Sequence, residues 1–192
     1  MPGFEEQFGI ILIPEPYRPA LPAKPNVLPD VWWEHSVRTD LEAINKTKVG
    51  HALLEAIKHH GVIVSILPDS VPDACSAGTL PMEDDLHARD PLDITMGPSI
   101  YYSPERFSHG HRCQDRFKVF GQLVMDGHET LLHELVHAFR LASFKYDRQK
   151  AVKGFSFYNN TEEIYAILVQ GIYASERGRA VRGTHVGQFP IG

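Results

Sequence analysis

The most constraining feature of this chain is the apolar stretch LLHELVHAFR, residues 131–140. Asp126 and Glu129 precede it with the spacing of a capping box, which predicts the start of a helix. Apolar residues fill the later turns, so the helix is expected to be largely buried around its polar residues. Any fold of this chain therefore has to place two histidines and a glutamate inside the protein, where they need partners.

The spacing of the two histidines is that of a metal site. At 3.6 residues per turn, His133 and His137 lie about 40° apart on one helix face, and two imidazoles so placed can bind one tetrahedral zinc ion. Glu134 lies about 100° around the helix from His133. It does not bind the metal, but it can reach a water held there and act as general base in an attack on a carbonyl. The alternative, a core helix with hydrogen-bonded histidines, must also explain the buried Glu134.

A catalytic zinc site takes a third protein ligand, and the residues that follow exclude one familiar solution. The metzincin continuation places glycine at 140 and histidine at 143, where this chain has Arg140 and Ser143. Asp147 stands in KYDRQ, without the Gly-Thr setting of the aspartate-ligand class. The remaining common solution is a glutamate on a later helix.

The stretch NNTEEIYAILVQ predicts that helix, from about residue 160 to 178. Its first turn offers Glu162 and Glu163. Ala166 follows Glu163 by one turn and lets the two helices approach closely, whereas Tyr165 would stand in the gap beside Glu162. Glu163 is therefore the preferred third ligand. The alternative is that both acids only favour the positive end of the helix dipole, which explains one of them without a metal.

Hydrolysis also needs a hydrogen-bond donor for the developing oxyanion. Tyr158, just before the second helix, and His185, in RGTHVG, are the two candidates, and the sequence does not choose between them. His109 and His111 raise the alternative of a second metal, but a solvent-exposed loop accounts for them better. Arg179 is expected to pair with acids rather than to bind substrate.

Charge and hydropathy narrow the range of partners. The formal net charge is −5 at pH 7, so no basic field invites nucleic acid or an anionic membrane. No apolar run approaches the roughly 18 residues that a membrane span needs. The N-terminal stretch lacks the basic region of a classical signal peptide. Cys75 and Cys113 could form one disulfide or remain structural thiols, and their spacing is not that of a metal site.

The other segments predict one domain, residues 31–192, preceded by a proline-rich arm or linker, residues 1–30. Residues 39–61 predict a helix that begins at a capping box and divides near Thr47. Residues 62–67 are β-branched and predict a strand. The pattern therefore mixes helices and strands.

The centre of the chain completes the predicted fold. Residues 92–104 predict a second strand or a hairpin, in which glycine and proline favour an edge or a bulge over a central strand. An extended substrate peptide could pair with such an edge. Residues 68–91, rich in turn formers, predict a loop. The expected fold class is α+β and zincin-like, with a helical zinc core and a small sheet or edge hairpin.

With these residues assembled, LLHELVHAF followed by NTEEIYA, the chain resembles the gluzincin metallopeptidases. The segment INKTKVGHALLEAI before a short strand resembles the pattern that bacterial effector metallopeptidases have ahead of the zinc helix. The late stretch EEIYAILVQGIYASERGRAVRGTHVG is most similar to metallopeptidase domains at the C-termini of VgrG spike proteins of type VI secretion systems. The resemblance covers roughly residues 40–190 and is specific at the two helices.

The resemblance implies a toxin domain with zinc bound by His133, His137 and Glu163, and with Glu134 catalytic. It further implies a protein or peptide substrate, a cognate immunity protein and attachment to a secretion spike. Delivery into a target cell without a signal peptide follows, with the periplasm as one destination. Two alternatives stay open: a peptidoglycan amidase or endopeptidase, and a non-catalytic binding module whose structural zinc has four protein ligands.

Overall fold

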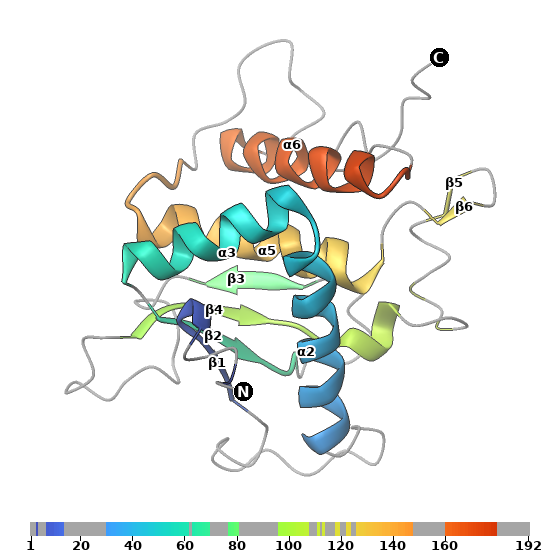
Figure 1. The fold of residues 1–192 in the computed structure, drawn as a ribbon, viewed down its shortest axis with the longest axis horizontal. Coiled ribbons are helices and arrows are strands. Elements are labelled where there is room, and N and C mark those ends of the chain that lie inside the picture. The colour runs from blue at the N-terminus through green and yellow to red at the C-terminus, as the bar shows by residue number, and fades with distance from the viewer. Residues whose placement is uncertain are drawn as a thin grey trace.

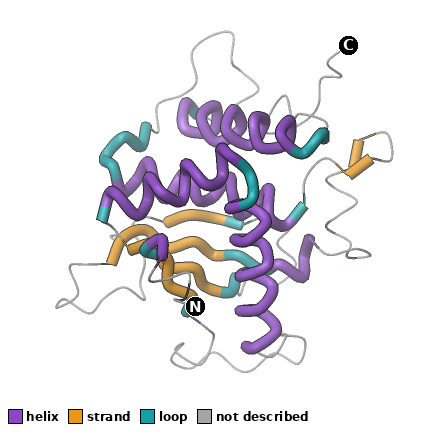
Figure 2. The backbone as a smooth tube through the Cα atoms, in the orientation of Figure 1, coloured by secondary structure: helices purple, strands orange, loops and turns teal. Residues whose placement is uncertain are grey.

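The structure is a computed structural model. It contains both helices and a sheet, which confirms the predicted α+β class (Figures 1 and 2). The described residues are 3, 7–13, 30–61, 63–69, 77–80, 96–107, 111, 113, 118–119, 122–123, 126–147 and 160–179. Their helices are α2 (Asp30–Asn45), α3 (Lys48–His60), the 3-10 helix η2 (Pro104–Phe107), α5 (Gly127–Ala142) and α6 (Thr161–Glu176). Their strands are β1 (Ile10–Leu12), β2 (Ile63–Leu67), β3 (Gly78–Leu80), β4 (Met96–Tyr101), β5 (Lys118–Val119) and β6 (Gln122–Leu123).

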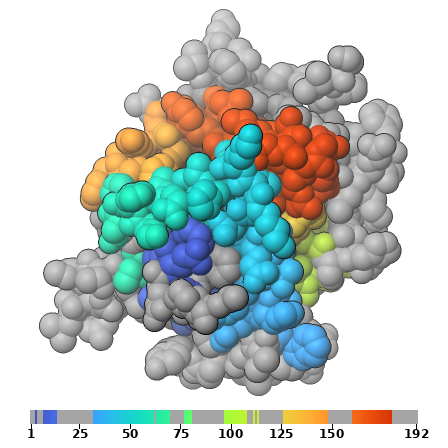
Figure 3. Space-filling model, in the orientation of Figure 1, coloured from blue at the N-terminus to red at the C-terminus, as the bar shows by residue number. Residues whose placement is uncertain are grey.

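Helix α5 is the centre of the molecule. It lies between the sheet and helix α6, packing against β3 and β4 on one side and against α6 on the other (Figure 1). Helices α2 and α3 also contact it, and both lie with α6 on the face seen in Figure 3. Its side chains are buried without interruption from Glu129 to Ala138, as its apolar composition predicts.

Helix α2 begins at Asp30, so the capping box predicted at Thr39 is wrong. Thr39 lies inside the helix, where its hydroxyl donates to the carbonyl of His35 at 2.9 Å. The reason is tertiary packing. Trp33 and Val37 are buried one turn apart, and they extend the apolar face of the helix upstream of the predicted start.

The predicted break between the two N-terminal helices is confirmed. Thr47 is the N-cap of α3, and its side chain accepts from the backbone N–H of Gly50 at 3.0 Å. Gly61 ends the helix with φ of 72°, a left-handed conformation that glycine adopts without strain. The start of α3 is also tied to α6, because the N–H of Lys48 donates to the Glu176 carboxylate at 2.7 Å.

The four-stranded sheet has the order β1-β2-β4-β3, in which β1, β2 and β4 run parallel and β3 is antiparallel. Strand β4 pairs on both sides, so the edge strand predicted within residues 92–104 is wrong. The predicted bulge is present instead, because the register between β2 and β4 shifts where Gly97 and Pro98 lie. The loop predicted at residues 68–91 is wrong at β3, which forms the edge next to α5.

Part of the proline-rich arm belongs to the sheet. Strand β1 pairs with β2, and Phe8, Ile10 and Leu12 are buried in the core. Ile10 and Leu12 supply the buried face of the strand, and Phe8 adds to the core from just before it. Residues 14–29 lie outside the described part of the chain.

Helices α5 and α6 begin as predicted. Asp126 and Glu129 form the capping box, with each side chain accepting from the other residue's backbone N–H at 3.2 Å. Asn160 caps α6 by accepting from the N–H of Glu163 at 3.0 Å. The helices run antiparallel, because the first turn of α6 lies beside the end of α5. In the described residues, no helix is both long and apolar enough to cross a membrane.

Candidate metal centre

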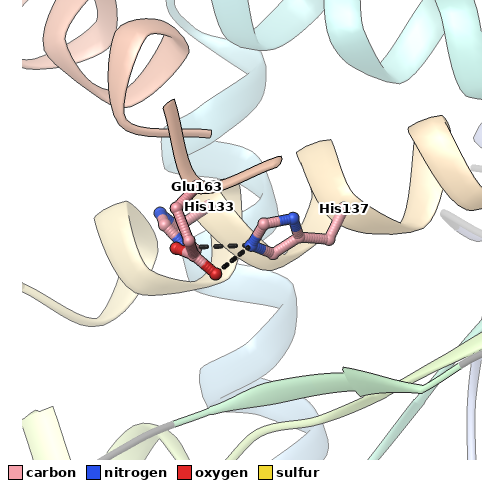
Figure 4. A group of neighbouring side chains, drawn as sticks. All are labelled: His133, His137 and Glu163. Atoms are coloured by element: carbon pink, nitrogen blue, oxygen red, sulfur yellow. Dashed lines mark hydrogen bonds and ion pairs between the residues drawn. The ribbon is translucent and has the colours of Figure 1, made fainter. Parts of the chain in front are cut away.

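Three side chains from α5 and α6 converge at one point (Figure 4). Nε2 of His133 lies 3.1 Å from Nε2 of His137 and 3.2 Å from Oε2 of Glu163. Nε2 of His137 lies 3.5 Å from Oε1 of Glu163. The histidines come from successive turns of α5 and the glutamate from the first turn of α6. Within the described residues, this is the one group of such side chains whose ligand atoms all lie within 4.8 Å of one another.

These separations fit the edges of a tetrahedral coordination shell. With bonds of about 2.0–2.1 Å to zinc, two ligand atoms stand about 3.4 Å apart. The measured separations of 3.1, 3.2 and 3.5 Å are within a few tenths of an ångström of that value. Two imidazoles and a carboxylate are also a donor set that suits zinc. The residues present therefore fit a zinc ion.

A carboxylate stands behind His137. Oε1 of Glu162 lies 3.8 Å from Nδ1 of His137, on the side of the ring away from Glu163. Burial lowers the pKa of His137, but the nearby carboxylates, foremost that of Glu162, outweigh it and raise this pKa above its usual value. At 3.8 Å the two atoms are too far apart for a hydrogen bond, so Glu162 acts on this imidazole through its charge.

The two neighbouring glutamates have different surroundings. Glu163 faces both histidines, whereas the fully buried Glu162 accepts from Nε of Arg140 at 2.5 Å and from the N–H of Asp147 at 2.9 Å. Burial raises the pKa of Glu162, but His137 and its other donors outweigh burial and hold that pKa below its usual value. The preference for Glu163 thus agrees with the geometry, and its role as a ligand stays a prediction.

The residues one turn later lie as the spacing argument requires. Ala166 is fully buried and belongs to the core that joins the helices. Tyr165 is 43% exposed, and the guanidinium of Arg140 lies over its ring at 3.8 Å. A small side chain therefore occupies the inner position behind Glu163, and the tyrosine lies at the outer surface.

Thr79 is a site residue that the sequence did not reveal. Its Oγ1 lies 2.7 Å from Oε2 of Glu134 and 3.1 Å from the carbonyl oxygen of the same residue. It lies on β3, in a turn-rich stretch where a single threonine gives no signal. Glu134 is buried, and this hydrogen bond supplies its carboxylate with a protein partner. The burial of Glu134 therefore no longer counts against the alternative of a core helix without a metal.

Other predicted residues lie outside the described part of the chain. Both oxyanion candidates, Tyr158 and His185, are among them, as is His109. Nδ1 of His111 accepts from the backbone N–H of Cys113 at 3.2 Å. Cys113 is buried and disulfide-bonded, which agrees with the disulfide alternative. The chain's other cysteine is also outside the described residues.

A second polar cluster lies at the opposite end of the same helix pair. We call it the arginine end, and the group of His133, His137 and Glu163 the histidine end. Arg179 pairs with the Asp126 carboxylate and lies 3.0 Å from Oε1 of Glu129, as expected for an arginine that pairs with acids. The other members of the arginine end are His128 and Tyr173, which share a hydrogen bond of 2.9 Å.

The arginine end perturbs its two acids in opposite directions. Burial raises the pKa of Asp126, but His128 and Arg179 outweigh it and hold that pKa below its usual value. Burial and the neighbouring Asp126 raise the pKa of Glu129 to about 7, against the opposing effect of Arg179. Asp126 is therefore held in its ionised form, whereas the pKa of Glu129 lies near neutral pH.

Comparison with known proteins adds no identification. No protein-family model matches the sequence, and neither a curated protein nor a solved structure matches it. The assignment of a function therefore depends on the geometry of the site and on the motifs of the chain.

Proposed function

We propose that this chain is a zinc-dependent metallopeptidase of the gluzincin type, with a zincin-like fold. The supporting observation is the convergence of His133, His137 and Glu163 from two helices. A His-Glu-x-x-His pattern on one helix arises by chance more readily than a pattern that also meets a carboxylate from a second helix. Here that carboxylate lies within 3.5 Å of both imidazoles.

The number of ligands supports a catalytic rather than a structural metal. Structural zinc sites have four protein ligands, whereas catalytic sites have three and keep one position open. Within the described residues the group has three members. This count favours an enzyme over a binding module.

Each residue of the proposed site has its own role in peptide hydrolysis. A zinc ion held by the triad supplies Lewis acidity to a peptide carbonyl and makes water more acidic. Glu134 follows His133 on α5 and is not part of the triad, as a general base requires. It takes the proton of the attacking water and returns it to the leaving amine. Tyr158 or His185 stabilises the tetrahedral intermediate.

The substrate is proposed to be an extended peptide lying along β3. In the described residues, β3 pairs with β4 on one side only, and it packs next to α5. Its residue Thr79 touches Glu134, so a peptide paired with this edge would pass the general base. The role first expected of residues 92–104 thus moves to the neighbouring strand.

The resemblance of the late stretch to metallopeptidase domains of VgrG spike proteins supports a role as a secreted effector. We propose a secreted bacterial effector domain that is delivered into a target cell. Its partners would be a spike protein and a cognate immunity protein. In this proposal the toxicity comes from the peptidase reaction.

Metal content and hydrolysis test the enzymatic proposal. Purified protein should hold one zinc ion per chain and cleave a fluorophore-quenched casein. Glu134→Gln should keep the zinc and slow the cleavage by about a hundredfold or more, since it removes the general base. Glu55→Gln is the matched control, because Glu55 lies on α3 and, in the described part of the chain, forms ion pairs only with Lys58 and His59 of the same helix. Zinc-free protein, or full activity of Glu134→Gln, would overturn the proposal.

Expression in two compartments tests the effector role. The chain and Glu134→Gln are produced in the cytoplasm of a bacterial host and, with an export signal, in its periplasm. Growth arrest by the unaltered chain alone, in one of the compartments, is expected. Purified protein is also incubated with isolated sacculi. Release of cell-wall peptides without casein cleavage would replace the peptidase with a peptidoglycan amidase.

A further inference from the structure

The hydroxyl of Thr79 is held between two oxygens of one residue. Oε2 and the backbone carbonyl oxygen of Glu134 lie 2.7 and 3.1 Å from Oγ1. A hydroxyl has one proton, so Thr79 donates to one of these acceptors at a time. The carboxylate is the closer one, and hydrogen bonds to charged acceptors are the stronger ones. The contact therefore fixes the Glu134 side chain relative to its own helix.

Thr79 itself is anchored by the sheet. It pairs with Ile100 of β4, which is fully buried. The hydroxyl is therefore presented to α5 by a strand whose neighbour is part of the core. Glu134 is oriented from outside its helix, by an element that holds none of the candidate metal ligands.

The contact leaves one carboxylate oxygen for proton transfer. The described residues form a hydrogen bond to Oε2 of Glu134 and none to Oε1. When Oε1 takes up the proton, Oε2 remains an acceptor for the hydroxyl. Thr79 can therefore stay bonded whether Glu134 is ionised or has taken up a proton, and the side chain need not reorient between these states.

We propose that Thr79 is a positioning residue that holds Glu134 in the orientation for general-base catalysis. This inference rests on the proposed peptidase function. It assigns β3 two tasks, because the strand would hold the substrate peptide and orient the base that acts on it. A misplacement of a catalytic group by about 1 Å can lower a rate by about a hundredfold.

Three variants test this role in the zinc-loaded protein with the quenched casein. Thr79→Val removes the hydroxyl and keeps the shape, and it should lower kcat by about tenfold to a hundredfold while KM stays within about twofold. Thr79→Ser keeps the hydroxyl and should restore most of kcat. Thr39→Val is the matched control, because its hydroxyl bonds a helix carbonyl at an exposed site on α2. Zinc content should be the same in all of them.

A second measurement does not depend on activity. In metal-free protein, Thr79→Val should shift the urea midpoint of unfolding clearly less in a Glu134→Ala background than in the unaltered chain. Equal shifts would mean that Thr79 does not act through Glu134, and they would overturn the inference.

The outcomes separate the two proposals. If zinc and Glu134-dependent hydrolysis are present but Thr79→Val keeps its kcat, the positioning role fails and the peptidase stands. The same conclusion follows if Thr79→Ser is as slow as Thr79→Val. If the unaltered chain shows no hydrolysis that Glu134→Gln removes, both proposals fail.

Discussion

The pair of helices α5 and α6 buries polar groups at both of its ends, but in different ways. At the arginine end, the acids Asp126 and Glu129 meet the guanidinium of Arg179, a cation that the chain supplies itself. At the histidine end, two imidazole nitrogens and a carboxylate point at one another. Such atoms offer lone pairs to a common point, which is the arrangement that a cation from solution would fill.

The difference explains why only one end is a candidate for chemistry. At the arginine end, the guanidinium of Arg179 already offsets the acids with a fixed positive charge, so this cluster stabilises a helix contact. A triad of three ligands keeps a coordination position for a substrate. The predictions below perturb one end at a time.

Metal removal should have the largest effect, and it should act on the histidine end. A ligand at a thousandfold excess over its Kd stabilises a fold by about 4 kcal/mol. Chelation should therefore lower the urea midpoint of the unaltered chain by a corresponding amount, and Glu163→Gln should make the midpoint insensitive to zinc. Arg179→Met is the control, because it should keep the zinc response. An unaltered chain whose midpoint ignores the chelator would contradict the comparison.

The pH dependence of stability should report the arginine end. Glu129 has a folded pKa of about 7 against an ordinary value of 4.5, so from pH 4.5 to 7 the folded chain binds more protons than the unfolded one. The free energy of unfolding should then fall as pH rises across this window. Glu129→Gln should flatten the profile by up to about 3 kcal/mol, because the amide stays neutral.

The measurement for Glu129 is a difference between two urea-unfolding series at pH 4.5 to 7. Asp40, whose burial raises its pKa to about 6, contributes a slope of the same sign, and the subtraction removes it. Glu55→Gln, on the surface of α3, should follow the unaltered chain. Parallel profiles for Glu129→Gln and the unaltered chain would show that this carboxyl does not retain its proton.

The parts of the structure that could be predicted are those in which the determining contacts are local. The caps at Asp126 and Asn160 lie within four residues of the groups that they bond, so their patterns were visible in the sequence. The same holds for His133 and His137, which one helical turn places together. The small residue one turn after Glu163 favours this acid over Glu162, and the structure has its carboxylate facing the histidines.

The parts that could not be predicted depend on contacts between distant residues. Strand β3 is short and turn-rich, and it exists because β4 pairs with it. Thr79 contacts Glu134 because β3 pairs with β4, and no local sequence pattern predicts that pairing. The early start of α2 has a similar cause, because burial of Trp33 against the rest of the core decides it.

Removal of the guanidinium should have an intermediate effect. Arg179→Met leaves two partly or fully buried acids without that cation, and a buried acceptor that loses its partner costs about 2 kcal/mol. The urea midpoint should fall accordingly, while zinc content and casein cleavage stay unchanged. Arg38→Met is the matched control, because Arg38 forms a helix-surface pair with Glu34 at 3.9 Å. A loss of zinc in Arg179→Met would show that the two ends are coupled.

Glu162→Gln should have the smallest effect. It tests whether the negative charge of this residue strengthens zinc binding at the histidine end. Glu162 joins both kinds of contact, since it accepts from Arg140 at 2.5 Å and lies 3.8 Å from Nδ1 of His137. The amide keeps the size of the side chain but loses the negative charge beside the imidazole. Loss of such an outer carboxylate weakens metal binding by about tenfold or more, which is about 1.4 kcal/mol at the lower limit.

The control for this prediction is Glu176→Gln, the same change at the other end of α6, where the carboxylate accepts from the N–H of Lys48. Competition with a fluorescent zinc chelator gives the Kd of each variant. Glu162→Gln should bind zinc more weakly than the unaltered chain but more tightly than Glu163→Gln, and Glu176→Gln should not differ. If Glu162→Gln lost zinc as completely as Glu163→Gln, the two acids would share the ligand role. The histidine end would then have four protein ligands, which would favour a structural zinc over a catalytic one.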